Sequence, residues 1–189
     1  MVQQIVDPAP LAVSANDKSR LYGTANPLFD GTLTGVVNGD DVTASFSTAA
    51  VLTSPVGTYP IIPLLNDPDS KLGNYSVTST NGTLTVGQAS SAVTITVLQN
   101  PAILRIKAAP LAVTANLQLQ GSLPTGTVDF VVDGSTVASN IPLVGGMATF
   151  AIQQLTIGQH TVVANYHGDA NFSASTSAPI TVNRSPRPH

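Results

Sequence analysis

Hydrophobic and polar residues alternate one by one in many short segments along this chain. In the first half the alternating segments are LAVSA (11–15), VTASFS (42–47), YSVTS (75–79) and TLTV (83–86). In the second half they are AVTITV (92–97), LAVTANLQL (111–119), TVDFVV (127–132), ATFAI (148–152), TVVANY (161–166) and PITV (179–182). A period of two places successive side chains on opposite faces of a strand, so each segment predicts a half-buried β-strand.

Two dipeptide turn signals lie between alternating segments. Asn81-Gly82 separates YSVTST from TLTV, and Asp133-Gly134 separates TVDFVV from STVAS. A two-residue hairpin loop needs positive φ at both positions, which Asn, Asp and Gly tolerate, so we predict a hairpin at each dipeptide. Many short strands joined by tight turns are typical of an all-β fold, here two tandem antiparallel β-sandwich (Ig-like) domains.

The composition argues against a fold built on long helices. Charged residues make up 9 % of the chain, all ten acids are aspartate, and the only lysines are Lys18, Lys71 and Lys107. Glutamate and lysine favour helices and cover their solvent faces, so their scarcity argues against any long amphipathic helix.

Charge and hydropathy narrow the range of partners. The formal net charge is −3 and no basic stripe exists, so we expect no contact with nucleic acid. The longest apolar runs, such as YPIIPLL (59–65), are far shorter than a membrane span, so we expect no membrane insertion. The first ten residues carry neither a basic region nor a long apolar stretch, so no signal peptide is expected there, and cysteine is absent. We expect a monomer.

A domain boundary is expected at GQASSA, residues 87–92. This segment is small and polar, it follows TLTV, and a new alternating segment begins directly after it. We therefore expect one β domain in residues 1–88 and a second in residues 89–183. Residues 184–189 contain two prolines and are expected to form a linker or a terminal extension.

The first half resembles the MBG domain, a module of large bacterial secreted and surface proteins. The resemblance is carried, in order along the chain, by PAPLAVSANDKSRLYGTANP (8–27), LTGVVNGD (33–40), SPVGTYPI (54–61) and NYSVTSTNGTLTV (74–86). One departure is the polar loop LNDPDSKLG (65–73), which is longer than the family usually has before its Asn-Tyr.

The second half resembles a bacterial Ig-like repeat domain, over about residues 92–183. The segments that carry this resemblance are PTGTVDFVVDGSTV (124–137) and GGMATFAIQQLTIGQHTVVANYHGDANFSASTSAPITV (145–182). Together the two resemblances imply an extracellular or cell-surface bacterial protein with further domains in the same chain.

A near repeat joins the two halves. APLAVSAN (9–16) and APLAVTAN (109–116) differ at one position, but DKSRLYGTANP follows the first and LQLQGSLPTGT follows the second. The continuations have nothing in common, so we interpret the repeat as two strands of one pattern in unlike modules rather than as an internal duplication.

The chain offers little for catalysis. Nucleophilic catalysis needs a base beside a nucleophile, and the only histidines are His160, His167 and His189. His160 and His167 lie seven apart near one strand, so we expect them on opposite faces, at the surface or at strand ends. Asp40 and Asp41 are adjacent and are expected to cap a turn rather than to act as a carboxylate pair. We therefore predict no enzyme and no catalytic residues.

Calcium is the only cofactor that the sequence leaves open. Zinc is excluded by the lack of cysteine, whereas calcium takes several loop oxygens. Three clusters offer such oxygens: NDPDS (66–70), NGDD (38–41) and GDAN (168–171). None has the spacing of an EF-hand loop, and Asp and Asn also favour turns. Asp67 and Asp69 are the first candidates for calcium. A covalent Lys–Asn crosslink through Lys18 is a further hypothesis, with Asp as the only acid available to assist it.

The segment YHGDANF (166–172) concentrates polar and aromatic residues, and we predict that its role is architectural. It links one strand to the next. Gly168 can adopt positive φ, and Asp169 and Asn171 can bond the backbone of the turn. Tyr166 and Phe172 are expected to close the end of the core.

Two functions from different classes remain. The first is a non-catalytic spacer or stalk that holds neighbouring domains of a larger bacterial surface protein. The alternative is a surface module that binds a glycan or a protein, which the long loop LNDPDSKLG favours because loops carry binding residues. Tyr22, Tyr59, Tyr75 and Tyr166 are expected to pack in the core rather than to stack on sugars.

Overall fold

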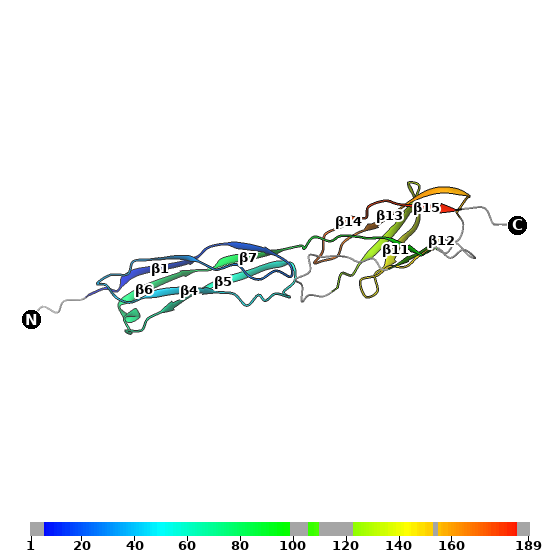
Figure 1. Cartoon of the computed structure of the whole chain (residues 1–189). Coiled ribbons are helices and arrows are strands. Elements are labelled where there is room, and N and C mark those ends of the chain that lie inside the picture. The colour runs from blue at the N-terminus through cyan, green and yellow to red at the C-terminus, as the bar shows by residue number, and fades with distance from the viewer. Residues whose placement is uncertain (1–5, 99–105, 110–122, 153–154, 185–189) are drawn as a thin grey trace, which may run out of the picture. The chain divides into compact units, whose positions relative to one another are not determined.

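The computed structural model describes residues 6–98, 106–109, 123–152 and 155–184. The chain divides into two compact units, residues 1–87 and residues 88–189 (Figure 1). Within the described residues the secondary structure is strand apart from one 3-10 turn, so the predicted all-β fold class is confirmed. No helix of the described part is long and apolar enough to cross a membrane.

The first unit is built from seven strands and the 3-10 turn. These are β1 (Ala9–Ala15), β2 (Lys18–Leu21), β3 (Gly31–Thr34), β4 (Thr43–Ser47), β5 (Gly57–Asn66), η1 (Leu72–Asn74), β6 (Tyr75–Thr80) and β7 (Gly82–Gly87). They form two sheets, with the strand orders β3-β1-β6 and β2-β7-β5-β4. The alternation of LAVSA appears as buried Leu11, Val13 and Ala15 on one face of β1.

Two strand pairs of the first unit are parallel, which the sequence did not predict. β1 pairs in parallel with β6, and β2 pairs in parallel with β7. The other pairs, β1 with β3, β4 with β5 and β5 with β7, are antiparallel. The N-terminal strands therefore lie beside the last strands of the unit.

The predicted hairpin at Asn81-Gly82 is wrong. Among the pairings of the described residues, β6 pairs with β1 while β7 pairs with β2 and β5, and the two strands do not pair with each other. Neither residue has the positive φ that a two-residue hairpin needs. The chain instead runs straight on, because β1 and β2 offer both strands a partner along their length. Gly82 is needed for close approach: a Cβ there would lie 2.8 Å from the Ala15 carbonyl oxygen and 2.7 Å from that of Asn16.

The core of the first unit gathers residues from distant parts of the sequence. Leu11, Val42 and Tyr75 are buried together, and partly buried apolar side chains pack around them. The Tyr75 hydroxyl donates a hydrogen bond to the Asp40 carboxylate at 2.6 Å and accepts one from the Val37 amide at 3.1 Å. The Asp40 amide itself donates to the Val37 carbonyl, so Asp40 lies in a turn that Tyr75 anchors.

The second unit has two further sheets. Its strands are β8 (Thr96–Leu98), β9 (Ile106–Ala109), β10 (Thr127–Val132), β11 (Ser135–Pro142), β12 (Ala151–Ile152), β13 (Gly158–Tyr166), β14 (Ser175–Thr176) and β15 (Ile180–Arg184). One sheet has the order β11-β10-β13-β14, with β15 also on β13, and the other has the order β12-β9-β8. The predicted strand 111–119, most of the second APLAVTAN copy and His189 lie outside the described residues.

The predicted hairpin at Asp133-Gly134 is confirmed. β10 and β11 are antiparallel neighbours, and Val132 faces Ser135 across the turn. Asp133 and Gly134 have φ values of 50° and 79°, as this turn requires. The same dipeptide chemistry therefore forms a turn here and none at Asn81-Gly82.

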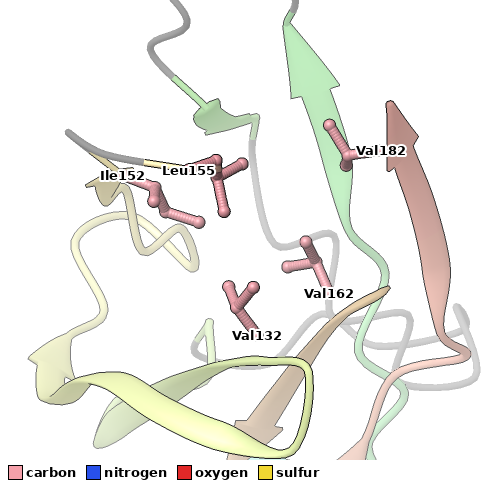
Figure 2. Close-up of a cluster of buried hydrophobic side chains, with 5 residues drawn as sticks. All are labelled: Val132, Ile152, Leu155, Val162 and Val182. Carbon is pink, nitrogen blue, oxygen red and sulfur yellow. The ribbon is translucent and has the colours of Figure 1, made fainter. Parts of the chain in front are cut away.

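The core of the second unit lies where its two sheets face each other. Val132, Ile152, Leu155, Val162 and Val182 form a buried cluster, drawn in Figure 2. These side chains come from β10, β12, β13 and β15 and from the segment after β12, so the cluster ties both sheets together.

Candidate functional site

The segment YHGDANF contains the densest polar network of the second unit, and it centres on Asp169. One carboxylate oxygen accepts hydrogen bonds from the amides of Asn171 and Phe172, both at 2.8 Å. The other accepts the amide and the hydroxyl of Thr125, also at 2.8 Å. A single side chain thus holds its own turn and fastens it to the segment that leads into β10.

The electrostatics of Asp169 follow from these contacts. Burial opposes ionisation of the carboxyl, but the donors from Thr125, Asn171 and Phe172 outweigh it, so the pKa of Asp169 is lowered. Both oxygens face N–H or O–H groups, whereas calcium needs oxygens that point at it with free lone pairs. The GDAN cluster is therefore arranged as an anion receptor for its own aspartate rather than as a cation site.

The rest of the motif has the geometry that the sequence predicted. Gly168 has a φ of 81°, and a Cβ there would lie 2.8 Å from the Phe172 carbonyl oxygen. Tyr166 and Phe172 are each only 2 % exposed. Burial raises the pKa of Tyr166, whose hydroxyl has no hydrogen-bond partner within the described residues. The two aromatic rings close the core on either side of the turn.

The start of the second unit is bonded to the same motif. The Ala89 amide donates to the Asn171 carbonyl, and the Ser173 amide donates to the Ala89 carbonyl, both at 2.9 Å. The Gln88 side chain donates to the Asp169 carbonyl. Residues 88 and 89, which the sequence marked as a polar boundary, are therefore held against the YHGDANF turn.

His160 is not at the surface, as the sequence led us to expect, because it is only 8 % exposed. Its Nδ1 lies 2.6 Å from the Asp133 carboxylate, and its Nε2 lies 2.9 Å from the Thr156 carbonyl oxygen. The Asp133 carboxylate and the Thr156 carbonyl raise the pKa of His160, because both stabilise a protonated ring. The sequence could not show this pairing, since Asp133 is explained locally as a turn residue.

The contacts of His160 resemble those of a catalytic triad but exclude its chemistry. The Thr156 hydroxyl lies 3.4 Å from Nε2, on the far side of the ring from Asp133. A general base would need a free lone pair on Nε2. Here a carbonyl oxygen lies closer to that nitrogen, so Nε2 carries a proton and cannot accept one. The arrangement is a polar clamp between the β10–β11 turn and the start of β13.

His167 has a separate set of contacts on the exposed side of the sheet. Its Nε2 lies 3.1 Å from the Asp129 carboxylate, and its Nδ1 lies 3.1 Å from the Thr127 hydroxyl. The other Asp129 oxygen accepts the Asn140 amide at 2.7 Å. That bond lies where β10 and β11 change register and Asn140 takes a φ of 54°. Asp129 thus stabilises an irregularity of the sheet.

The calcium candidates occupy the loop between β5 and β6. The two Asp67 oxygens accept the amides of Lys71 and Leu72, each at 2.8 Å. These bonds, with that of Leu72 first, lower the pKa of Asp67. Asp69 is exposed. Within the described residues no group of three or more acidic or histidine side chains is placed to hold a metal ion. A calcium role for Asp67 and Asp69 stays a prediction.

Asp30 brings Lys18 and Asn16 together, which bears on the crosslink hypothesis. The Lys18 amine and the Asn16 amide each donate to an Asp30 oxygen at 2.7 Å. Lys18 and then Asn16 lower the pKa of Asp30, so the carboxyl is ionised. Crosslink chemistry needs a neutral, nucleophilic amine, whereas an exposed ion pair keeps the amine charged. The geometry therefore supports an ion pair rather than a Lys–Asn bond.

Arg20 is a structural residue that the sequence analysis missed. It is 8 % exposed and lies on β2. Its guanidinium donates to the Asn26 side chain at 2.7 Å and to the Val51 carbonyl at 2.6 Å, and Asn26 donates to the Ala50 carbonyl at 2.7 Å. The signal available was its inward position in the alternation that leads to buried Tyr22.

Comparison with known proteins agrees with this architecture. Residues 11–85 match the MBG domain (YGX type), and residues 77–184 match the bacterial Ig-like domain (group 3). A search of curated proteins finds no match. The chain therefore belongs to the bacterial Ig-like domain (group 3) family, with an MBG domain before that domain. Both resemblances predicted from the sequence are confirmed.

Two solved structures show what the chain is similar to in shape. The fibronectin(III)-like modules of Clostridium thermocellum CbhA align with 89 % of this chain and 88 % of theirs, at 16 % identity and a TM-score of 0.34. Drosophila N-cadherin EC1-4 aligns with 95 % of this chain and 51 % of its own, at 7 % identity and a TM-score of 0.31. Neither likeness bears on function. The families that match are non-catalytic Ig-like modules typical of bacterial surface proteins.

Proposed function

We propose that this chain is a non-catalytic pair of structural modules, acting as a spacer or stalk in an extracellular or cell-surface bacterial protein. Its partners are the neighbouring domains of a larger chain. The family membership supports this role, because MBG and bacterial Ig-like modules are typical of multidomain surface proteins.

One observation carries the proposal: loop carboxylates hold the backbone of the protein itself. Five aspartates accept backbone amides, namely Asp17 from Thr83, Asp67 from Lys71 and Leu72, Asp129 from Asn140, Asp133 from Thr161, and Asp169 from Thr125, Asn171 and Phe172. A carboxylate that stabilises a turn has few lone pairs left for a ligand or a proton transfer. The polar groups of the loops are therefore used to stiffen the modules.

The test is a combined search for binding and turnover with the full chain. We expect no binding on a glycan array and no hydrolysis of ester, peptide or glycoside substrates. Turnover that disappears in His160→Ala but persists in His167→Ala would contradict the proposal, because only His160 has triad-like contacts.

The binding alternative is favoured by one feature of the first unit. Ile62 and Leu64 are 48 % and 65 % exposed on β5, opposite Ser47 and Ser45 of β4. Adjacent exposed apolar side chains on a sheet are typical of a protein-binding surface. If the array or a candidate protein ligand does bind, Ile62→Ser/Leu64→Ser should abolish binding, and the Val137→Ser variant on the second unit should not.

A further inference from the structure

Two long segments of the first unit run side by side in parallel without a change of register. Ala9 faces Tyr75 and Ser14 faces Thr80 in the β1–β6 pair. Lys18 faces Leu84 and Leu21 faces Gly87 in the β2–β7 pair. The offset between partners is the same in both pairs, so residues 9–21 and 75–87 form one continuous parallel zipper. We call these two segments the clamp. At the usual rise of a strand it is about 40 Å long.

The clamp is sealed where its two ladders meet. Asp17 falls opposite Thr83, and its carboxylate accepts the Thr83 amide at 2.7 Å. Gly82 lets the two backbones approach closely at this point. Beyond Leu21 the Tyr22 amide continues the pairing by donating to the Gly87 carbonyl at 2.8 Å. The side chain of Asp17 thus replaces a ladder bond in the gap between β1 and β2.

Buried side chains protect the clamp from water. Leu11 and Val13 on one segment are 1 % and 2 % exposed, and Leu84 and Val86 on the other are 0 % and 1 % exposed. Water competes for exposed hydrogen bonds and weakens them, so a covered ladder resists opening better than an exposed one.

The ends of the clamp are the points where the chain enters and leaves the first unit. The chain enters at the Ala9 end of one segment and leaves toward the second unit at the Gly87 end of the other. Because the segments are parallel, these points lie at opposite ends of the zipper (Figure 1). Tension along the chain therefore pulls the two segments past each other, and it loads all of their hydrogen bonds together.

We propose that the first unit carries tension along the chain and that the clamp is the element that resists it. The biological purpose of this resistance rests on the spacer role proposed above. The resistance itself is a property of the fold, so it can be measured whether or not the chain also binds a ligand.

The second unit lacks an equivalent arrangement in the part of the chain that the structure describes. Its entry segment pairs in parallel with the YHGDANF turn through one bridge, Ala89 with Phe172. Its exit strand, β15, is antiparallel to β13. No pairing of the described residues joins the entry segment to β15. We therefore expect the second unit to unfold at lower tension than the first.

The test is single-molecule force spectroscopy of the full chain held at its two ends. We expect two unfolding steps, with the shorter extension at the higher force. The extension identifies the unit, because residues 1–87 form the smaller unit and 88–189 the larger. The proposal is wrong if the shorter extension is released first.

A change of pulling direction separates the clamp from general stability. Asp7 and Gly73 are both exposed and precede the paired residues Ala9 and Tyr75 at the same end of the clamp. A Cβ at Gly73 meets nothing within 4 Å, and the chain has no cysteine of its own. Handles on Asp7→Cys/Gly73→Cys should peel the segments apart one bond at a time, at a much lower force than end-to-end pulling. Equal forces in the two directions would overturn the proposal.

Two matched variants locate the resistance. Asp17→Ala removes one hydrogen bond to a charged group across the clamp and should speed unfolding of the first unit under constant tension about tenfold. Asp67→Ala removes two such bonds in the loop before η1, outside the clamp. It should lower the Tm of the first unit but leave its rate under tension unchanged. If Asp67→Ala speeds unfolding under tension as much as Asp17→Ala does, the clamp is not the resisting element.

Discussion

The Asp169 carboxylate accepts both the backbone amide and the hydroxyl of Thr125, a residue 44 positions earlier in the chain. The same carboxylate accepts two amides of its own turn. The link between β13 and β14 is therefore fastened to the entrance of β10 by one side chain.

Asp169→Ala should destabilise the second unit by about 2 kcal/mol, because it leaves several partly buried amides without an acceptor. Chemical unfolding followed by two probes, one in each unit, measures this. The transition of the first unit should not move. The exposed Asp41→Ala serves as the control, with no change in either unit, and Asp169→Asn should recover part of the loss.

The stability of the second unit should decrease as the pH rises through the pKa of His160. That pKa is raised above its ordinary value of about 6.5 by Asp133 and the Thr156 carbonyl. The folded state therefore favours the protonated ring, so the stabilisation is complete below pH 6.5 and is lost at higher pH. Asp133, whose pKa is lowered, limits the range on the acid side, because its contribution is lost as the pH falls through that lowered pKa.

Tm measured between pH 4 and pH 9 tests this dependence. The His160→Gln variant should lose the decline in Tm of the second unit above pH 6.5. His167→Gln is the matched control, since His167 lies on the exposed side of the sheet. A decline that persists unchanged in His160→Gln would assign it to another group.

Gly82→Ala should destabilise the first unit by about 3 kcal/mol. The new Cβ would lie within 2.8 Å of two backbone oxygens in the clamp, and backbone cannot move aside cheaply. Gly73→Ala is the control, because nothing lies within 4 Å of its Cβ, and it should leave stability unchanged or raise it by about 0.5 kcal/mol. Equal stability of the two variants in urea unfolding would mean that the close approach at Gly82 is not needed.

Calcium should raise the Tm of the first unit only slightly. Both Asp67 oxygens already accept backbone amides, so a cation would have to displace them or use the remaining lone pairs. Differential scanning fluorimetry with calcium and with EDTA measures the effect. A large rise that disappears in Asp67→Ala/Asp69→Ala would show that the loop NDPDSKLG is a calcium site after all.

Some features of the candidate sites followed from the sequence because their causes are local. The Asp133-Gly134 hairpin depends on two residues that tolerate positive φ. The turn of YHGDANF depends on Gly168 and on a carboxylate two and three residues before the amides that it accepts. Such bonds form within a few residues, so the sequence contains all of the information that they need.

Other contacts could not be read from the sequence because their partners are distant. His160 meets Asp133 only because β13 lies beside β10. Thr125 reaches Asp169 for the same kind of reason. Arg20 finds its acceptors in a loop some thirty residues later. Residue type shows that these side chains need partners, but strand order decides which partners they have.

The sequence by itself determined that this protein is an all-β pair of unlike modules, since alternation with a period of two and turn chemistry depend only on neighbouring residues. Only the tertiary structure decided that Asn81-Gly82 is not a turn. There the pairing of residues 75–87 with residues 9–21 outweighs a local signal, because a long register of hydrogen bonds and buried side chains contributes more than one two-residue loop. Gly82 is needed for the approach of a distant strand, and that requirement exists only once the strands have met.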